Sequence, residues 1–182
     1  MQIEIRLATI ADSAGIAFVQ VNNYKLSYAA LFAKQYLDHF TVEEQTQDWR
    51  DLFATQPGEI VFVAQADEKI VGYALCRAQA REMPNYASEL VAFHVLPEYQ
   101  KHGIGTKLFR AVANALKQNG CNSLMLWTLK HNPVRRYYEA LGGELLGDKE
   151  YDIDDARVTE VAYGWQAIDT LILNLEKHTE HK

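Results

Sequence analysis

The sequence predicts a single mixed α/β domain whose elements follow the order βααβββαβαββ. Apolar and polar residues alternate with a period of about two at the start of the chain and again over 60–66 and 70–78, as in half-buried strands. After Gly103 the period changes to about 3.6 residues, which is typical of an amphipathic helix. The length of 182 residues, 48% of them hydrophobic, fits one domain with a substantial core.

The first elements are a strand and two helices. Residues 2–7 alternate and predict the first strand. Thr9-Ile10-Ala11-Asp12 has the form of a capping box, in which side chains satisfy the free N–H groups at a helix start. We expect helices over roughly 12–31 and 34–53 to follow.

A hairpin and a long strand come next. Pro57-Gly58 ends the helical pattern, and strands over 60–66 and 70–78 are joined by Asp67-Glu68-Lys69, a hairpin signal. Residues 86–95 predict a strand that is long enough to cross the core.

A helix, a strand and a second helix follow the glycine loop. The helix after Gly103 has one apolar face, and Asn119-Gly120 ends it. Residues 123–129 predict a buried strand. Asn132-Pro133 then begins a helix, because Asn caps well and the first turn tolerates Pro, and Gly142-Gly143 ends it.

Two strands close the domain, over about 144–152 and 157–163, with acidic turn residues between them. We assign residues 1–167 to the domain and 168–182 to a C-terminal tail that can form a short helix.

Composition excludes several classes of protein. The formal net charge of −6 argues against a general nucleic-acid binder, and no apolar run approaches the roughly 20 residues that cross a bilayer. The N-terminus lacks the pattern of a secretory signal, so we expect a cytoplasmic protein. Cys76 and Cys121 have no zinc-binding spacing and are expected to be free thiols.

Charged side chains are unevenly distributed along this acidic chain. Two short segments hold the basic residues Lys101, His102, Lys107, Lys130, His131, Arg135 and Arg136, and a third holds the acidic residues Glu150, Asp152, Asp154 and Asp155. A locally basic patch favours a small anionic ligand, and solvated surface charge is the alternative reading.

The stretch VLPEYQKHGIGTKLF, residues 95–109, places a glycine loop between a strand and a helix. The first N–H groups of a helix have no partner within it, and the helix dipole adds partial positive charge, so such a loop favours an anion. Gly103 and Gly105 permit close backbone approach, and Lys101 and Lys107 add charge. The alternative is a plain turn in which the glycines relieve crowding. Because GIGTKL lacks the third glycine of GxGxxG, and GxxxxGKS or GxxxxGKT is absent, dinucleotides and nucleoside triphosphates fit poorly.

The loop resembles the acyl-CoA signature of the GNAT superfamily of N-acetyltransferases, which here reads Gln100-Lys101-His102-Gly103-Ile104-Gly105 after the lead-in VLPEY. A second motif similar to that family follows over 132–142, NPVRRYYEALG. The resemblance covers nearly the whole chain and is most specific over 89–143. It implies a GNAT-like domain whose central, mostly antiparallel sheet is splayed at the acyl-CoA site.

The resemblance implies acetyl-CoA as cosubstrate and no metal. It implies that N–H groups from Gln100 to Thr106 hold the pyrophosphate, with Lys101 or Lys107 helping. The pantetheine arm would pair with one strand's backbone and contact the second motif, and Arg135 or Arg136 would meet a CoA phosphate unless these arginines are only helix surface charge. The implied cofactor-binding residues are Phe93, His94, Val95, Gln100, Lys101, His102, Gly103, Ile104, Gly105, Thr106, Asn132, Arg135 and Tyr138. We expect the His94 ring to pack on the opposite face of its strand.

Acetyl transfer to an amine sets chemical requirements. An alkyl amine with a pKa of about 10.4 is protonated at neutral pH, so a proton acceptor is needed, directly or through water. Glu89 is our candidate because a carboxylate on the apolar strand ELVAFHV is costly to bury; exposure at the strand's start, or binding of a cationic substrate, is the alternative. The backbone N–H near Phe93 can stabilise the oxyanion. The family register favours Tyr138 as proton donor to the leaving thiolate, although it also fits a core stripe and Tyr137 could replace it.

The resemblance assigns the choice of acceptor to the first two helices and the last hairpin. They supply the acidic residues of 150–155 and the aromatic residues Tyr24, Tyr28, Phe32, Tyr36, Phe40 and Trp49. Aromatic faces and carboxylates suit a cation, so a small amine or polyamine-like acceptor fits. A protein N-terminus or lysine side chain stays open, and the plainer reading makes the aromatics core and the acids a solvated turn.

These features predict an acyl-CoA-dependent N-acetyltransferase whose partners are acetyl-CoA and an amine, with no nucleic acid or membrane involved and a homodimer left open. A catalytically silent GNAT-fold module that binds acyl-CoA as a sensor or interaction domain is the alternative. A nucleotide-binding regulator is disfavoured by the missing fingerprints.

Overall fold

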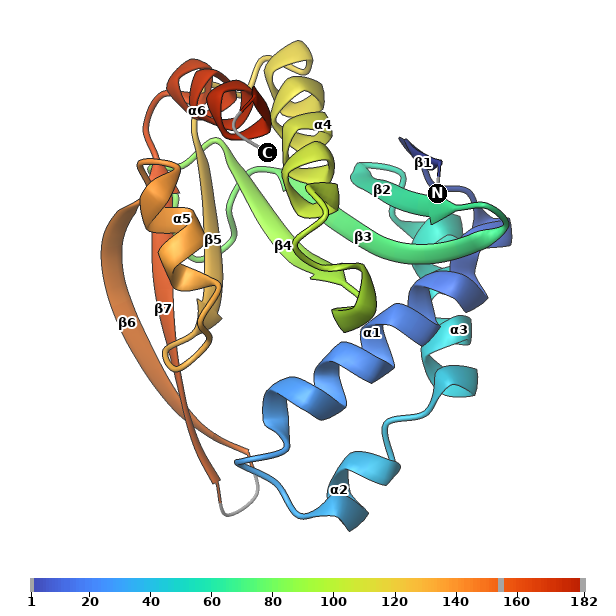
Figure 1. The fold of residues 1–182 in the computed structure, drawn as a ribbon. Helices are drawn as coiled ribbons and strands as arrows, with labels where there is room; N and C mark the ends of the chain where they lie inside the picture. Colours follow the sequence, from blue (N-terminus) through green and yellow to red (C-terminus); the bar gives the residue numbers. More distant parts are fainter. Residues whose placement is uncertain (1, 154–155, 181–182) are drawn as a thin grey trace.

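The computed structural model describes residues 2–153 and 156–180, and its centre is one seven-stranded sheet (Figure 1). The strand order is β1-β2-β3-β4-β5-β7-β6. The strands are β1 (Ile3–Leu7), β2 (Glu59–Ala66), β3 (Lys69–Ala78), β4 (Ser88–Val95), β5 (Leu124–Leu129), β6 (Glu144–Ile153) and β7 (Ala156–Trp165). Neighbouring strands run antiparallel except for β4 and β5, which are parallel. The predicted mixed α/β class and mostly antiparallel sheet are confirmed.

Helices cover both faces of this sheet. They are α1 (Ser13–Tyr28), α2 (Lys34–Asp38), α3 (Val42–Thr55), α4 (Ile104–Gln118), α5 (Arg135–Ala140) and α6 (Ile168–Glu180), with short 3-10 turns at Ile10–Asp12 and Pro97–Tyr99. Within the described ranges, no helix has the length and apolar character needed to cross a membrane.

Two adjacent residues of β4 show which helices share a face. His94 packs on Tyr73, which packs on Trp49 of α3 (ring centroids 5.4 and 5.2 Å apart). Phe93 packs on Phe109 of α4 (5.6 Å). Successive side chains of a strand point to opposite faces. Therefore α3, with α1 beside it, covers one face of the sheet, and α4, with α5 and α6, covers the other.

The predicted single helix over 34–53 is wrong, because two helices occupy this segment. α2 ends at Asp38, and α3 begins after Thr41, whose Oγ1 accepts a hydrogen bond from the Glu44 N–H (3.3 Å). This side chain satisfies a free helical N–H and so favours a new helix start there. The other predicted elements agree within a few residues: α5 begins at Arg135 rather than at Asn132-Pro133, and α6 confirms the last helix.

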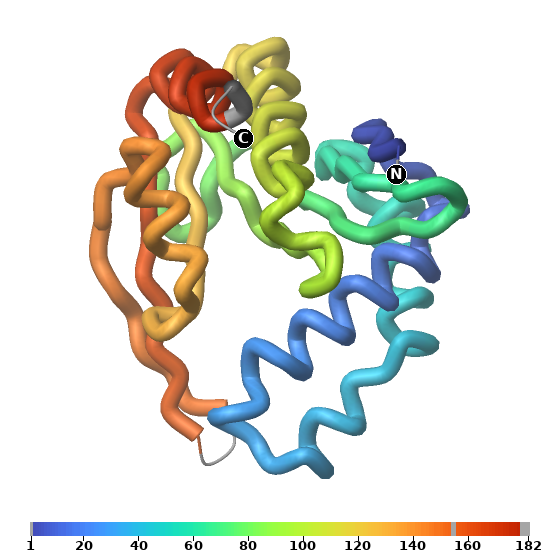
Figure 2. The backbone as a smooth tube through the Cα atoms, in the orientation of Figure 1, coloured from blue at the N-terminus to red at the C-terminus, as the bar shows by residue number. Residues whose placement is uncertain are grey.

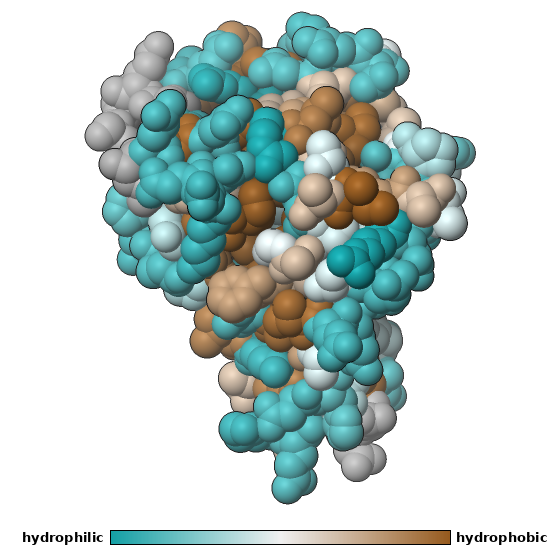
Figure 3. Space-filling model, turned by 90° about the vertical axis from the view of Figure 1, so that its right-hand side faces the viewer, coloured by the Kyte–Doolittle hydropathy of each residue, from teal (hydrophilic) through white to brown (hydrophobic). Residues whose placement is uncertain are grey.

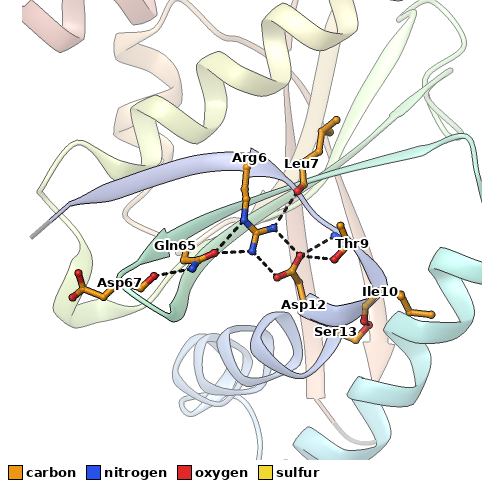
Figure 4. A network of polar contacts seen from close by, with 8 residues as sticks. All are labelled: Arg6, Leu7, Thr9, Ile10, Asp12, Ser13, Gln65 and Asp67. Carbon is orange, nitrogen blue, oxygen red and sulfur yellow. Dashed lines mark hydrogen bonds and ion pairs between the residues drawn. The ribbon is translucent and has the colours of Figure 1, made fainter.

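A polar network fixes the start of α1 against the β2–β3 hairpin (Figure 4). Arg6 donates two hydrogen bonds of 2.8 Å to the Asp12 carboxylate, which also accepts from the Thr9 N–H (2.8 Å), as the predicted capping box requires. Arg6 also donates to Gln65 Oε1 (2.7 and 3.1 Å), and Gln65 donates to the Asp67 carbonyl (2.7 Å). The hydrogen bonds from Arg6 lower the pKa of Asp12.

The parallel strands β4 and β5 pair at one end only. Glu89 lies opposite Met125 and Leu90 opposite Leu126, and beyond these pairs the strands part. The register between β3 and β4 shifts at the same place and leaves Val91 without a partner in β3. A bulge of this kind bends a strand, so it turns β4 away from β5 and opens the sheet.

The C-terminal half of α1 lies next to this opening in the sheet. Its end lies beside the β6–β7 hairpin (Figure 2), where Phe32, Leu37, Leu129 and Val158 form a separate apolar cluster. At the other end of the molecule, α6 adds Leu171 and Leu175 to the main core. The segment 168–180 is thus packed into the same core as the rest of the chain.

Candidate active site

A cavity of about 620 Å³ lies where β4 and β5 part. β4 contributes residues 90–95 and β5 residues 126–129. On the α4 face the cavity is lined by the loop before α4 and by the start of α5, and on the other face by α1. The opening in the sheet therefore connects two differently lined chambers.

The glycine loop forms one end of the cavity. Gly103 (φ +75°) caps α4 in the left-handed region, and Lys101 (φ +63°) also lies there. The first helical N–H with a backbone acceptor is that of Lys107, which donates to the Gly103 carbonyl (3.1 Å). The N–H groups of Ile104 and Gly105 precede it and have no acceptor within the helix. This is the anion-binding geometry that the loop predicts.

The backbone of β4 faces the gap at alternate residues. The Leu96 N–H donates to the Val71 carbonyl of β3 (2.9 Å), and successive backbone groups of a strand point to opposite sides. The N–H and C=O groups of Phe93 and Val95 therefore point toward the gap. Gln100 Nε2 donates to the Val95 carbonyl (2.9 Å) and so ties the loop to the end of β4.

The side chains of Phe93 and His94 lie on opposite faces, as the sequence predicts for His94. A Cβ atom on Gly105 would lie 3.3 Å from the Phe93 ring, so the loop and the ring are in close contact. Burial lowers the pKa of His94 to about 4, and its ring is therefore neutral at pH 7. A neutral ring gives no positive charge to a phosphate.

Asn132 and two tyrosines line the cavity from the segment that contains α5. Asn132 Oδ1 accepts from the Val134 N–H (3.1 Å), which leaves its amide N–H groups free to donate. The Tyr137 hydroxyl donates to Thr106 Oγ1 (3.3 Å). The Tyr138 hydroxyl has no hydrogen-bond partner within residues 2–153 and 156–180, and burial raises its pKa, so it is protonated at neutral pH.

The two arginines of α5 lie outside the cavity. Arg135 is half-buried and donates to the Lys130 carbonyl (2.6 Å) and to the Tyr163 hydroxyl (3.1 Å). It thereby connects α5 to the end of β5 and to β7. Arg136 is exposed.

Glu89 lies at the closed end of the gap, where β4 and β5 still pair. It is half-buried, and its Oε2 accepts from the Arg81 N–H (3.3 Å). The cavity begins one residue further along the strand, at Leu90.

The chamber on the α1 face is aromatic and contains a carboxylate. Tyr24 and Tyr28 of α1 line it with their rings 4.4 Å apart, and Trp127 and Glu160 line it from β5 and β7. Burial and the charge of Glu160 raise the pKa of the neighbouring Tyr151 hydroxyl to about 12.

The structure thus brings together ten of the predicted cofactor-binding residues in one cavity: Phe93, His94, Val95, Gln100, Lys101, Gly103, Gly105, Thr106, Asn132 and Tyr138. Three others, His102, Ile104 and Arg135, do not line it; His102 is exposed and Ile104 is buried in the core.

The predicted acceptor residues divide in the same way. Tyr24 and Tyr28 line the cavity, whereas Trp49 belongs to the main core and the rings of Phe32, Tyr36 and Phe40 pack on other aromatic rings. The acidic hairpin residues Glu150 and Asp152 are exposed and pair with Arg157, and Asp154 and Asp155 lie outside the described residues.

Sequence reasoning missed Glu160 and Trp127. The argument used for Glu89 also applies to Glu160, because a carboxylate in the largely apolar strand VTEVAYGW is equally costly to bury.

A second hollow, of about 680 Å³, lies between the start of α1 and the β2–β3 hairpin and shares no lining residue with the first. Figure 3 views the molecule from the right-hand side of Figure 1 and shows hydrophobic surface between hydrophilic surface. Phe18, which lines this hollow, is one of the exposed large hydrophobic residues. In this hollow Arg6 pairs with Asp12, and Lys69 lies 3.9 Å from Glu98. The part of the chain that the structure describes has no group of three or more His, Cys, Asp or Glu side chains that could hold a metal ion.

Comparison with known proteins gives consistent matches. The model of the Acetyltransferase (GNAT) family matches residues 27–142. The chain is 30% identical over 171 residues to YuaI, an uncharacterized N-acetyltransferase of Bacillus subtilis, and the match covers 93% of this chain and 96% of the relative. It is 24% identical over 165 residues to a spermidine N(1)-acetyltransferase of Thermoplasma acidophilum (84% and 99% covered). The crystal structure of the PaiA N-acetyltransferase from Thermoplasma acidophilum in complex with coenzyme A has the same fold (TM-score 0.68, 21% identity, 91% of this chain and 100% of that chain).

Proposed function

The chain belongs to the acetyltransferase (GNAT) family, and on this premise we propose that the cavity between β4 and β5 is where an acetyl group passes directly from acetyl-CoA to an amine. The chain is an acyl-CoA-dependent N-acetyltransferase. When bound, acetyl-CoA supplies the activated acetyl group. The chain's residues bind it, orient it and move protons.

The residues of the α4 face fit coenzyme A. The N–H groups at the start of α4 have no acceptor in the helix and suit its pyrophosphate, with Lys101 in the same wall. The free amide of Asn132 and the gap-facing backbone of Phe93 and Val95 suit the amide groups of the pantetheine arm. Gly105 keeps the loop close to the Phe93 ring without a side chain between them.

Tyr138 is the proton donor to the departing sulfur in this proposal. Its hydroxyl lines the cavity wall, makes no hydrogen bond within the described residues and stays protonated at neutral pH. Tyr137 is the less suitable donor because its hydroxyl already donates to Thr106. The departing thiolate, from a thiol with a pKa of about 8.5, takes up a proton at neutral pH, so a nearby donor favours its departure.

The backbone N–H of Phe93 or Val95 is the donor that stabilises negative charge on the acetyl oxygen, because both point toward the gap. Glu89 is the predicted proton acceptor for the amine. Because the cavity begins at Leu90, Glu89 acts in this scheme through water rather than by direct contact.

The acceptor enters from the α1 face and is a small-molecule amine in this proposal. Tyr24 and Tyr28, whose rings pack on each other, line this chamber. The relative from Thermoplasma acidophilum that is named a spermidine acetyltransferase supports a small amine over a protein substrate.

We also place the protein in the cytoplasm, since Cys76 and Cys121 are buried free thiols.

One observation carries the proposal: the anion-binding loop, the free Asn132 amide and the unbonded Tyr138 hydroxyl line a single cavity at a break in the sheet. The test incubates the purified protein with acetyl-CoA and a panel of alkyl amines and peptides, follows the free CoA thiol with a thiol reagent, and identifies the acetylated product by mass. We expect thiol release that depends on the amine. Tight binding of acetyl-CoA without thiol release on any amine would favour the silent sensor instead.

A further inference from the structure

Glu160 is the carboxylate of the acceptor chamber. It lies on β7 opposite Leu129, which is three residues beyond the last β4–β5 pair at Leu126, or about 10 Å along the strand. Its side chain is only 18% exposed. Tyr163, three residues further along β7, packs on Tyr138 (6.0 Å), so Glu160 points to the opposite face of the sheet from the proton donor.

The charge of Glu160 is compensated only in part by its neighbours, Lys149 and the Tyr151 hydroxyl. Its nearest cation, Lys149, lies 3.5 Å from Glu160 Oε2 but only 2.6 Å from Glu82 Oε2. One ammonium group is therefore shared by two carboxylates, and the trio carries one net negative charge. Of these three groups only Glu160 lines the chamber, together with Tyr24 and Tyr28.

Lys149 shows what this environment can bind. Its ammonium lies 4.2 Å from the centre of the Trp127 ring and 6.0 Å from that of Tyr151, besides its two carboxylate partners. Carboxylates with aromatic faces are the groups that bind ammonium ions in proteins. A second ammonium ion, from a ligand in the cavity, would meet the Glu160 carboxylate in a chamber that Tyr24 and Tyr28 also line.

The position of Glu160 determines which nitrogen it can usefully hold. A carboxylate in contact with the reacting nitrogen would favour its ammonium form, which has no lone pair to attack a thioester. Glu160 lies across the sheet from Tyr138 and far along the gap, so it suits a charge that is distant from the reaction.

We propose that Glu160 binds a second positive charge on the acceptor, so that the preferred acceptors are alkyl diamines and polyamines rather than monoamines. This inference rests on the acetyl transfer proposed above. It makes Glu160 a specificity-determining residue, whose loss lowers affinity for the acceptor and leaves the chemistry intact.

The experiment compares 1,4-diaminobutane with butylamine, which has the same carbon chain but one charge. Initial rates are measured at pH 7 for the wild type, Glu160→Gln and Asp148→Asn. Asp148 is the matched control because it is a carboxylate of the same hairpin that pairs with a surface lysine, Lys130 (3.3 Å). Melting temperature and acetyl-CoA affinity are measured for each variant.

We expect the wild type to prefer the diamine by roughly 10- to 100-fold in kcat/KM, the range that a charged hydrogen bond provides. Glu160→Gln should remove this preference by raising KM for the diamine, with butylamine unchanged, and Asp148→Asn should behave as wild type. Equal loss for both amines, an unchanged Glu160→Gln, or a wild type without preference overturns the inference. A wild type that acetylates only peptides also overturns it, although the proposed acetyl transfer would then stand. If no amine and no peptide caused release of the CoA thiol, both proposals would be overturned.

Discussion

Replacing Tyr138 by Phe removes one hydroxyl group and tests proton donation directly. The hydroxyl makes no hydrogen bond to another described residue, and the ring keeps its packing on Phe109 and Trp165 (6.3 Å to each). We therefore expect the free energy of unfolding to change by less than about 1 kcal/mol. If Tyr138 protonates the departing sulfur, kcat should fall about 10²- to 10⁴-fold, which corresponds to about 2.7–5.4 kcal/mol of transition-state stabilisation.

The assay is the initial rate of free CoA thiol release at saturating acetyl-CoA, with acetyl-CoA affinity measured by calorimetry. Affinity should stay within about threefold, because the hydroxyl serves the transition state rather than binding. Above the thiol pKa of about 8.5 the released sulfur is stable as a thiolate and needs no proton, so the deficit of Tyr138→Phe should narrow at high pH. Tyr137→Phe is the matched control: it loses the bond to Thr106 but no proton donor. A kcat for Tyr138→Phe within twofold of wild type, or a larger loss in Tyr137→Phe, would refute the assignment.

Three other substitutions test the loop, the α1 network and the sheet. Gly105→Val adds a side chain at a position where a Cβ alone would lie 3.3 Å from the Phe93 ring. We expect the Kd for coenzyme A, measured by calorimetry, to rise about 10-fold. An unchanged Kd would contradict the assignment of the loop to coenzyme A. Asp12→Asn removes the two charged bonds from Arg6 and should lower the melting temperature at pH 7. Arg6 lowers the pKa of Asp12, so the stability from this pair is present above the ordinary carboxyl pKa of about 3.9 and is lost as the pH falls through the folded-state pKa. The melting temperatures of wild type and Asp12→Asn should therefore converge at low pH. A difference that stays constant with pH would be the contrary result. Gly164→Ala puts a Cβ 2.5 Å from the ring and hydroxyl of Tyr86, and we expect a loss of about 1–3 kcal/mol, or about 2–12 °C in melting temperature, whereas an unchanged value would mean that the sheet relaxes around it.

Local signals were enough to predict most of the fold. Strand alternation, the left-handed Gly103 and Gly120, and the capping residues each act within a few residues, so the sequence displays them. The division of the second predicted helix was also encoded locally, by Thr41 and Glu44, which repeat the capping-box spacing. The parting of β4 from β5 was different. It depends on a bulge at Val91 and on pairing between segments more than 30 residues apart, and only the family resemblance pointed to it.

The donor half of the site was predictable because its binding groups are largely backbone. N–H groups at the start of α4 and along β4 are placed by the strand–loop–helix path itself, and the glycines mark that path in the sequence. Asn132 acts similarly, since its Oδ1 stabilises the turn before α5 and its amide is left to a ligand. The arginine prediction depended instead on where a long side chain points. Arg135 donates to the Lys130 carbonyl and the Tyr163 hydroxyl, which no local pattern reveals.

The acceptor half could not be predicted in the same way, because its groups come from α1, β5 and β7 and meet only in the folded chain. The acidic run after Gly147 drew attention to Glu150 and Asp152, yet both lie in solvent beside Arg157. The carboxylate that reaches the cavity is the isolated one, Glu160, on a strand that is otherwise largely apolar. Burial cost explains the difference: a cluster of acids is stable only where water screens it, whereas a single carboxylate can be kept in a half-buried wall if a cation or ligand compensates it. Lys149 compensates Glu160 in part, and the charge that remains is the physical basis for expecting a cationic acceptor.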